Sequence, residues 1–112
     1  MERTRLVTRG WLSSGMETHA CVTFDVGEDA MYVECDPRRF SAGQRVFLDL
    51  ILPDGNGMRL CAQVRASMFH GVGQRPPGVD LHLLYTDRHE RRLVKRVRTE
   101  AAQYRRAHAL EA

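Results

Sequence analysis

The sequence has little lysine, few cysteines and no long apolar run, and each shortage excludes a class of protein. Only Lys95 among the 17 basic residues is a lysine, so arginine carries almost all of the positive charge. No segment reaches the roughly eighteen consecutive apolar residues that a membrane-spanning helix needs. The N-terminal segment also lacks the apolar stretch of a secretory signal. We therefore expect a cytoplasmic protein that does not engage a membrane.

The three cysteines, Cys21, Cys35 and Cys61, form no CxxC pair. An odd number of cysteines in a cytoplasmic chain indicates reduced thiols rather than a disulfide framework. His19 and Cys21 share one face of a predicted strand, and Cys35 lies on another, so these residue types suit zinc. Because no CxxC or HxxxH spacing accompanies them, we predict that the cysteines are small core residues and that the protein holds no metal and no cofactor.

Short alternating segments occupy most of the chain and predict one antiparallel β domain. A length of 112 residues is enough for one hydrophobic core. Apolar and polar residues alternate over residues 19–24, 30–35, 45–52, 60–64 and 79–85, with a weaker candidate strand at 11–14. Strands this short, separated by turn residues, are typical of a small barrel or sandwich.

The segment from Arg45 to Val64 carries the clearest of these patterns. Its first half alternates Val46, Leu48, Leu50 and Leu52 with Phe47, Asp49 and Ile51. The turn residues of 53–57 follow, with proline, aspartate, asparagine and glycine in the positions that tight turns need. Alternation resumes with Leu60, Ala62 and Val64. The segment is therefore predicted to be a β-hairpin.

After Thr86 the apolar period changes to that of a helix. Thr86 or Asp87 can cap it, and Glu90 stands three residues after Asp87 as a capping-box partner. One apolar stripe contains Leu93, Val97, Ala101 and Tyr104, and the opposite arc is basic and includes Arg91, Lys95 and Arg98. We therefore divide the chain into an N-terminal arm at 1–15, a β-barrel at 16–86 and a basic amphipathic helix at 87–112 that packs on the barrel.

These features follow one another in the order found in a PilZ domain. The segments AMYVEC, FSAGQRVFLDLILPDG, LCAQV, RPPGVDLHLL and TDRHERRL, within residues 20–97, resemble that family, and more narrowly the small, atypical PilZ-like proteins of myxobacteria and their relatives. The resemblance implies a six-stranded antiparallel β-barrel followed by one C-terminal helix. It also implies bacterial signalling through the second messenger cyclic di-GMP.

PilZ receptors bind this dinucleotide with two motifs, an Arg-x-x-x-Arg pair before the barrel and Asp/Asn-x-Ser-x-x-Gly on an early strand. Arg5 and Arg9 match the first spacing. A guanidinium fork can grip a phosphate or the O6 and N7 edge of guanine, and it stacks on a purine face. Asp25 matches the start of the second motif, and its carboxylate can accept from the N1 and N2 donors of guanine.

The rest of the second motif departs from the family pattern. Gly27 replaces the serine and has no hydroxyl, and Ala30 replaces the glycine with a residue whose Cβ resists close approach. Glu28 and Asp29 add negative charge, and Asp80 stands where the family usually has a second glycine. The resemblance thus implies a cyclic di-GMP site with a degenerate second motif, formed by Arg5, Arg9, Asp25, Gly27 and Ala30.

No P-loop, hydrolase elbow or acid/base pair is recognisable, so we predict a protein that is not an enzyme. The main hypothesis is a signalling module of the PilZ cyclic di-GMP receptor type that acts on a signalling or motility protein. The alternative is a PilZ-like adaptor that no longer binds the dinucleotide and captures its partner through Arg91, Lys95 and Arg98. A third reading is nucleic-acid binding through the basic helix, although no aromatic residue is interleaved with its arginines.

Overall fold

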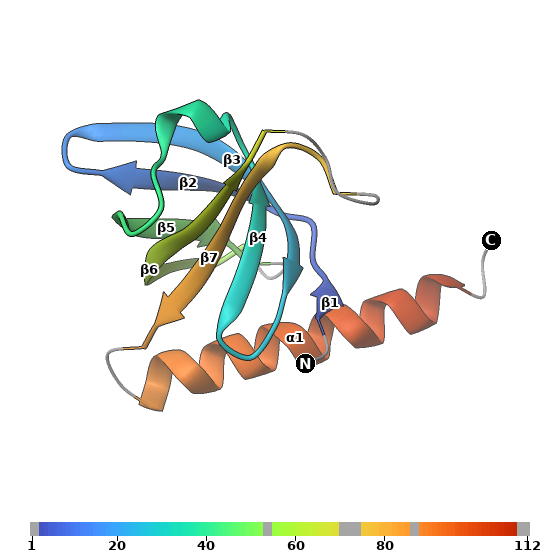
Figure 1. The fold of residues 1–112 in the computed structure, drawn as a ribbon. Helices are drawn as coiled ribbons and strands as arrows, with labels where there is room; N and C mark the ends of the chain where they lie inside the picture. The colour runs from blue at the N-terminus through green and yellow to red at the C-terminus, as the bar shows by residue number, and fades with distance from the viewer. Residues whose placement is uncertain (1–2, 53–54, 70–74, 86–87, 110–112) are drawn as a thin grey trace.

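The alternating segments form strands that curl into a barrel, and the helical segment lies alongside it (Figure 1). The computed structural model describes residues 3–52, 55–69, 75–85 and 88–109. Its elements are β1 (Thr4–Arg5), β2 (Arg9–Ser14), β3 (Glu17–Val26), β4 (Ala30–Glu34), the 3₁₀ turn η1 (Pro37–Arg39), β5 (Arg45–Ile51), β6 (Gly57–Met68), β7 (Gly78–Leu84) and α1 (Arg88–Ala109).

Six strands close into a barrel because β3 pairs on both of its sides. The antiparallel order is β3-β2-β5-β6-β7-β4, and β4 pairs with β3 to complete the ring. β1 is a further short strand that pairs with the end of β3. Within the described residues this confirms the predicted six-stranded antiparallel barrel with one C-terminal helix. Closure satisfies the strand edges that an open sheet would expose.

The core is formed by the inward face of each strand. Val46, Leu48 and Leu50 of β5 are at most 2% exposed, whereas Phe47 between them is 47% exposed. Opposite them, β6 buries Leu60, Ala62 and Val64, as its alternation predicts. β6 continues to Met68, beyond the predicted end at Val64. The predicted hairpin is therefore confirmed, with one face in the core and one toward solvent.

A β-bulge in β3 changes which residues of that strand face the core. Thr23 pairs with Val33, but Asp25 pairs with Tyr32, so one extra residue is inserted between them. Before the bulge Cys21 is in the core, and after it Val26 is in the core instead. The alternation has therefore been inverted, and Asp25 is placed on the outer face of the barrel.

The segment before residue 16 belongs to the barrel sheet, which differs from the predicted N-terminal arm at 1–15. β2 pairs with β3 on one side and with β5 on the other. The chain between β1 and β2 is tied to β3 by the buried hydroxyl of Thr23, which donates to the Leu6 carbonyl at 2.7 Å and accepts from the Thr8 amide at 2.8 Å. The alternation at 11–14 is weak because Leu12 is the only buried residue of that segment and two serines follow it.

The helix α1 lies against β1 and packs an apolar face on the barrel (Figure 1). Val94 and Val97 are buried in the common core and Leu93 is partly buried. The predicted stripe includes Leu93 and Val97 but not Val94, which is the more deeply buried of the two valines. The predicted capping residues 86 and 87 and the side chains of residues 101 and 104 lie outside the described part. No helix among the described residues has both the length and the apolar character needed to span a membrane.

Gly78 lies where the backbone of β7 closely approaches that of β4. A Cβ at Gly78 would lie 2.0 Å from the Val33 carbonyl oxygen, whereas a Cβ at Gly57 would meet nothing nearer than 3.9 Å. We expect Gly78→Ala to lower the free energy of unfolding by about 2–3 kcal/mol, because the β4–β7 backbones must separate. Gly57→Ala is the matched control and should change it by less than about 0.5 kcal/mol. Urea titration measures both, and equal stabilities would contradict the close approach.

Candidate functional site

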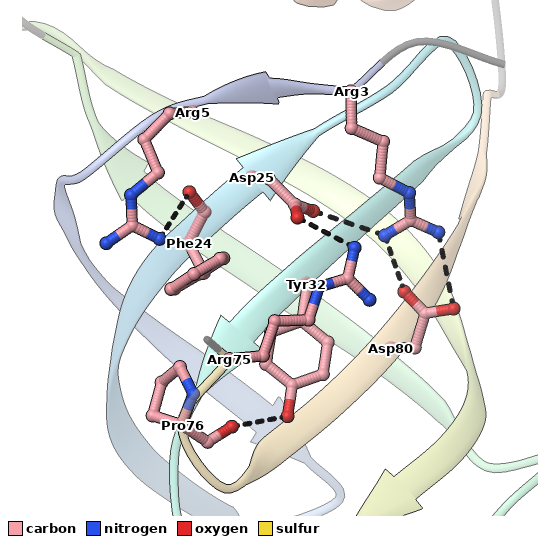
Figure 2. Close-up of polar contacts among 8 residues, drawn as sticks. All are labelled: Arg3, Arg5, Phe24, Asp25, Tyr32, Arg75, Pro76 and Asp80. Atoms are coloured by element: carbon pink, nitrogen blue, oxygen red, sulfur yellow. Dashed lines mark hydrogen bonds and ion pairs between the residues drawn. The ribbon is translucent and has the colours of Figure 1, made fainter. Parts of the chain in front are cut away.

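The site is centred on Asp25, a carboxylate at the end of β3 that is only 8% exposed (Figure 2). Its Oδ1 lies 3.2 Å from Nη1 of Arg3, and its Oδ2 lies 2.7 Å from Nη2 of Arg75. A buried carboxylate is costly unless it is paired, so two guanidinium groups compensate its desolvation. These partners come from opposite ends of the barrel sequence and meet only in the folded protein.

Arg3 joins Asp25 to a second carboxylate, Asp80 of β7 (Figure 2). Nη1 of Arg3 donates to Asp80 Oδ1 at 2.9 Å and Nη2 donates to Asp80 Oδ2 at 3.4 Å. The hydrogen bond to Asp80 raises the pKa of Arg3 and outweighs the opposing effect of burial. Together with Arg75 these residues form an ion cluster of two cations and two anions, which we call the Asp25 cluster.

Two aromatic rings border the Asp25 cluster. The guanidinium carbon of Arg75 lies 4.9 Å from the centroid of Tyr32, and the Tyr32 ring meets the edge of Phe24 at 6.0 Å. The Tyr32 hydroxyl donates to the Pro76 carbonyl at 2.6 Å, and burial raises its pKa. These contacts hold Arg75 over a ring face, the geometry of a cation–π interaction.

Arg5 occupies the other side of Phe24. Its guanidinium carbon lies 3.4 Å above the ring centroid, and its Nη1 donates to the Phe24 carbonyl at 3.2 Å. Arg5 is the backbone partner of Asp25 in the β1–β3 ladder. The structure thus brings together two predicted site residues, Arg5 and Asp25, that lie twenty positions apart in the sequence.

Arg9 begins β2 and is exposed, next to Val22 in the backbone register. It lines a shallow apolar groove of about 300 Å³ on the outside of β2, β3 and β4, formed by Arg9, Gly10, Trp11, Ala20, Cys21, Val22 and Glu34. Val22 and Phe24 follow one another along β3, so Arg9 and Arg5 flank one strip of the barrel surface. The Arg-x-x-x-Arg spacing therefore spans two short strands rather than one helix or loop.

Gly27 and Ala30 close the turn between β3 and β4. The Gly27 amide donates to the Ala30 carbonyl at 2.7 Å, and the Ala30 side chain is buried at 1% exposure. Gly27 thus has no side chain to offer a ligand, and the side chain of Ala30, the first residue of β4, is not directed to solvent. Of the two acids between them, Glu28 is exposed, and Asp29 lies with Oδ2 4.0 Å from Nδ1 of His82 on β7.

The predicted partner-binding residues of the helix divide into two kinds. Arg91 and Lys95 are exposed, whereas Arg98 is half-buried. Arg98 stands four residues after Val94 and directly after Val97, so it flanks the face that packs on the barrel rather than the opposite arc. Of these three residues, only Arg91 and Lys95 therefore lie on the predicted exposed basic surface.

The cysteines are packed as small apolar residues. Cys21 is buried, and Cys35 and Cys61 are partly buried. Burial raises the pKa of both Cys21 and Cys35 to about 12, and the charges of Asp36 and Glu34 add to this effect at Cys35. Within the described residues no group of three histidine, cysteine or acidic side chains is placed to hold a metal ion.

Several site residues were not predicted from the sequence. Arg3 stands two positions before Arg5, so strand periodicity places both on one side of the N-terminal segment, but that segment carries no clear strand pattern of its own. Phe24 and Tyr32 looked like ordinary strand residues. Arg75 follows a glycine-containing stretch of the sequence, and nothing local in its sequence links it to Asp25.

Comparison of the sequence with protein-family models finds no match, and a search of the curated proteins also finds none. Solved structures do match. The PilZ domain of YcgR from Escherichia coli, solved with c-di-GMP, has a TM-score of 0.79 at 13% identity and covers 99% of this chain and 96% of its own. The chain has the PilZ fold.

A second structure supports the same fold. The PilZ domain of CeSA from a cellulose-synthesizing bacterium has a TM-score of 0.71 at 16% identity, covering 89% of this chain and 97% of its own. The PilZ resemblance of the sequence is therefore confirmed at the level of the fold, including the helix that follows the barrel. In the PilZ fold of this chain, the Asp25 cluster lies where the N-terminal strand crosses the barrel (Figure 2).

The Asp25 cluster should contribute to stability because both oxygens of a buried carboxylate are paired. Replacing it by Asp25→Asn removes the charge that compensates Arg3 and Arg75, whose side chains are 23% and 30% exposed. We expect a loss of about 1–2 kcal/mol in the free energy of unfolding, reduced by solvent screening of the arginines. Asp49→Asn breaks the exposed Asp49–Arg59 pair and should cost less than about 0.5 kcal/mol. Equal losses in urea titrations would show that the cluster adds nothing to stability.

The raised thiol pKa values predict slow alkylation. At pH 8 a thiol of pKa about 12 is ionised in only about one molecule in ten thousand. In the Cys61→Ser variant, which retains only Cys21 and Cys35, we expect iodoacetamide to react about a thousandfold more slowly with the folded protein than with the same protein in guanidinium chloride. Mass spectrometry over a time course measures this ratio, and similar rates in both states would contradict it.

Proposed function

We propose that this protein is a non-enzymatic signalling module that binds cyclic di-GMP on the outer face of its barrel. The observation that carries the proposal is the β1–β3 register, which places Arg5 opposite Asp25 and so unites the two predicted ligand motifs. The PilZ domain of YcgR, which shares this fold, was solved with the same dinucleotide. At 13% identity the structural match supports the fold. The residues of the site support the ligand.

The surroundings of Asp25 have the chemistry that a guanine dinucleotide needs. Arg3, Arg5 and Arg75 supply guanidinium forks for phosphate oxygens or for the O6 and N7 edge of guanine. Arg5 stacked on Phe24 offers a flat cationic surface for a purine. Arg9 is exposed at the edge of the neighbouring groove and extends the positive charge along β3.

The proposed ligand would act through the N-terminal segment. β1 is only two residues long, and it lies between the end of β3 and the helix α1. A ligand held by Arg5 and Arg9 spans the junction of β1 and β2 and therefore fixes how this segment crosses the barrel. Because β1 contacts α1, the surface that the helix presents to a partner protein would change with ligand.

The second candidate function is a PilZ-like adaptor without the dinucleotide. Two observations favour it: Asp25 already has both oxygens paired, and Arg91 and Lys95 present exposed positive charge on the helix. In this case the ion pairs of the Asp25 cluster have a structural role and hold the N-terminal segment on the barrel. An acidic surface on the partner would complement the helix.

Isothermal titration calorimetry with cyclic di-GMP tests the main proposal. We expect measurable binding by the unaltered protein and a loss of affinity of about a hundredfold in the double variant Arg5→Ala/Arg9→Ala, which removes two charge-assisted contacts. The control Arg45→Ala/Arg59→Ala removes the same charge from exposed positions of β5 and β6 and should bind within about threefold.

Circular dichroism and thermal unfolding establish that each variant is folded. Absence of heat with the folded, unaltered protein at high concentration would overturn the receptor function. Binding that is equally weakened in both double variants would show that only net charge matters, and it would remove Arg5 and Arg9 from the site.

A further inference from the structure

Arg3 already grips an anion supplied by the protein itself. Asp80 accepts from both terminal nitrogens of its guanidinium, at 2.9 Å and 3.4 Å, and the nearer nitrogen is shared with Asp25 at 3.2 Å (Figure 2). A guanidinium whose two terminal nitrogens donate to one carboxylate has the geometry with which arginine binds a phosphate. The fork of Arg3 is therefore occupied in the ligand-free protein.

Asp80 is held in this position by the sheet. Its backbone pairs with that of Tyr32, and Tyr32 pairs with Asp25, so the three residues form a row across β7, β4 and β3. On either side of Asp80, Val79 and Leu81 are in the core, which directs Asp80 to the outer face. Its side chain is 21% exposed and thus remains within reach of a ligand.

Asp80 also determines the charge of the cluster. Arg3 and Arg75 balance Asp25 and Asp80, so these four residues are neutral together. Without the Asp80 carboxylate the cluster would carry one net positive charge beside Arg5. An incoming phosphate must therefore displace Asp80 from Arg3 and then lie near the carboxylate that it displaced, at an electrostatic cost.

We propose that Asp80 is an internal competitor that occupies Arg3 and sets the affinity of the site for its anionic dinucleotide. This inference rests on the proposed function, since it concerns the same ligand and the same face of the barrel. Binding is an exchange of one anion for another at Arg3, so Asp80 weakens the complex and shifts the response to higher ligand concentration.

The test is calorimetry with cyclic di-GMP on Asp80→Asn, which keeps the shape of the side chain and removes its charge. We expect the Kd to fall about tenfold at moderate salt. Asp49→Asn is the matched control, because it also removes one carboxylate paired with an arginine, on β5 and outside the Asp25 cluster, and its Kd should change less than about twofold. In the Arg3→Ala background the gain from Asp80→Asn should be much smaller, because only the repulsion by the Asp80 charge remains and the direct competition for Arg3 is lost.

The outcomes separate this inference from the proposed function. Tighter binding by Asp80→Asn than by the unaltered protein supports the competitor. Equal affinity, weaker binding, or a gain that is undiminished without Arg3 overturns it while the receptor function stands. No heat with the unaltered protein, when it is folded by circular dichroism, overturns the receptor function and the inference with it.

Discussion

The double pairing of β3 is the constraint on which both the barrel and the site depend. Its first part pairs with β2 and its second part with β4, so this one strand converts an open antiparallel sheet into a closed ring. β1 then adds to the free side of its last residues. Through this pairing β3 holds the N-terminal strand β1 on the barrel.

The bulge within β3 positions Asp25, the central residue of the candidate site. An extra residue between Thr23 and Asp25 inverts the alternation, so Val26 enters the core and Asp25 reaches the outer face. There it stands in line with Tyr32 and Asp80 across three strands. A regular strand would direct Asp25 toward the apolar interior, where an ionised carboxylate is strongly unfavourable. Bulges are used in this way next to functional sites in many sheets.

Charge compensation then couples distant parts of the chain. Arg3 before β1 and Arg75 before β7 both reach Asp25, and Arg3 also reaches Asp80. A ligand that displaced Asp25 and Asp80 from Arg3 would change how the N-terminal segment packs on the barrel. Since β1 lies against α1, the same contact connects the site with the helix that carries Arg91 and Lys95. The proposed receptor function and the adaptor alternative would therefore both depend on the N-terminal segment.

The sequence by itself determined the strands β3 to β7, the hairpin of β5 and β6 and the helix, because these depend on local periodicity and turn residues. Its ordered segments also carried the resemblance to PilZ domains. It also singled out Arg5 and Asp25. Only the tertiary structure decided that Arg5 and Asp25 are neighbours, that Arg3, Arg75 and Asp80 complete the cluster, and that Arg98 flanks the packed face of the helix. The physical reason is that ion pairs between residues such as Arg3 and Asp80 depend on strand order, register and a bulge, none of which leaves a periodic signal near either residue.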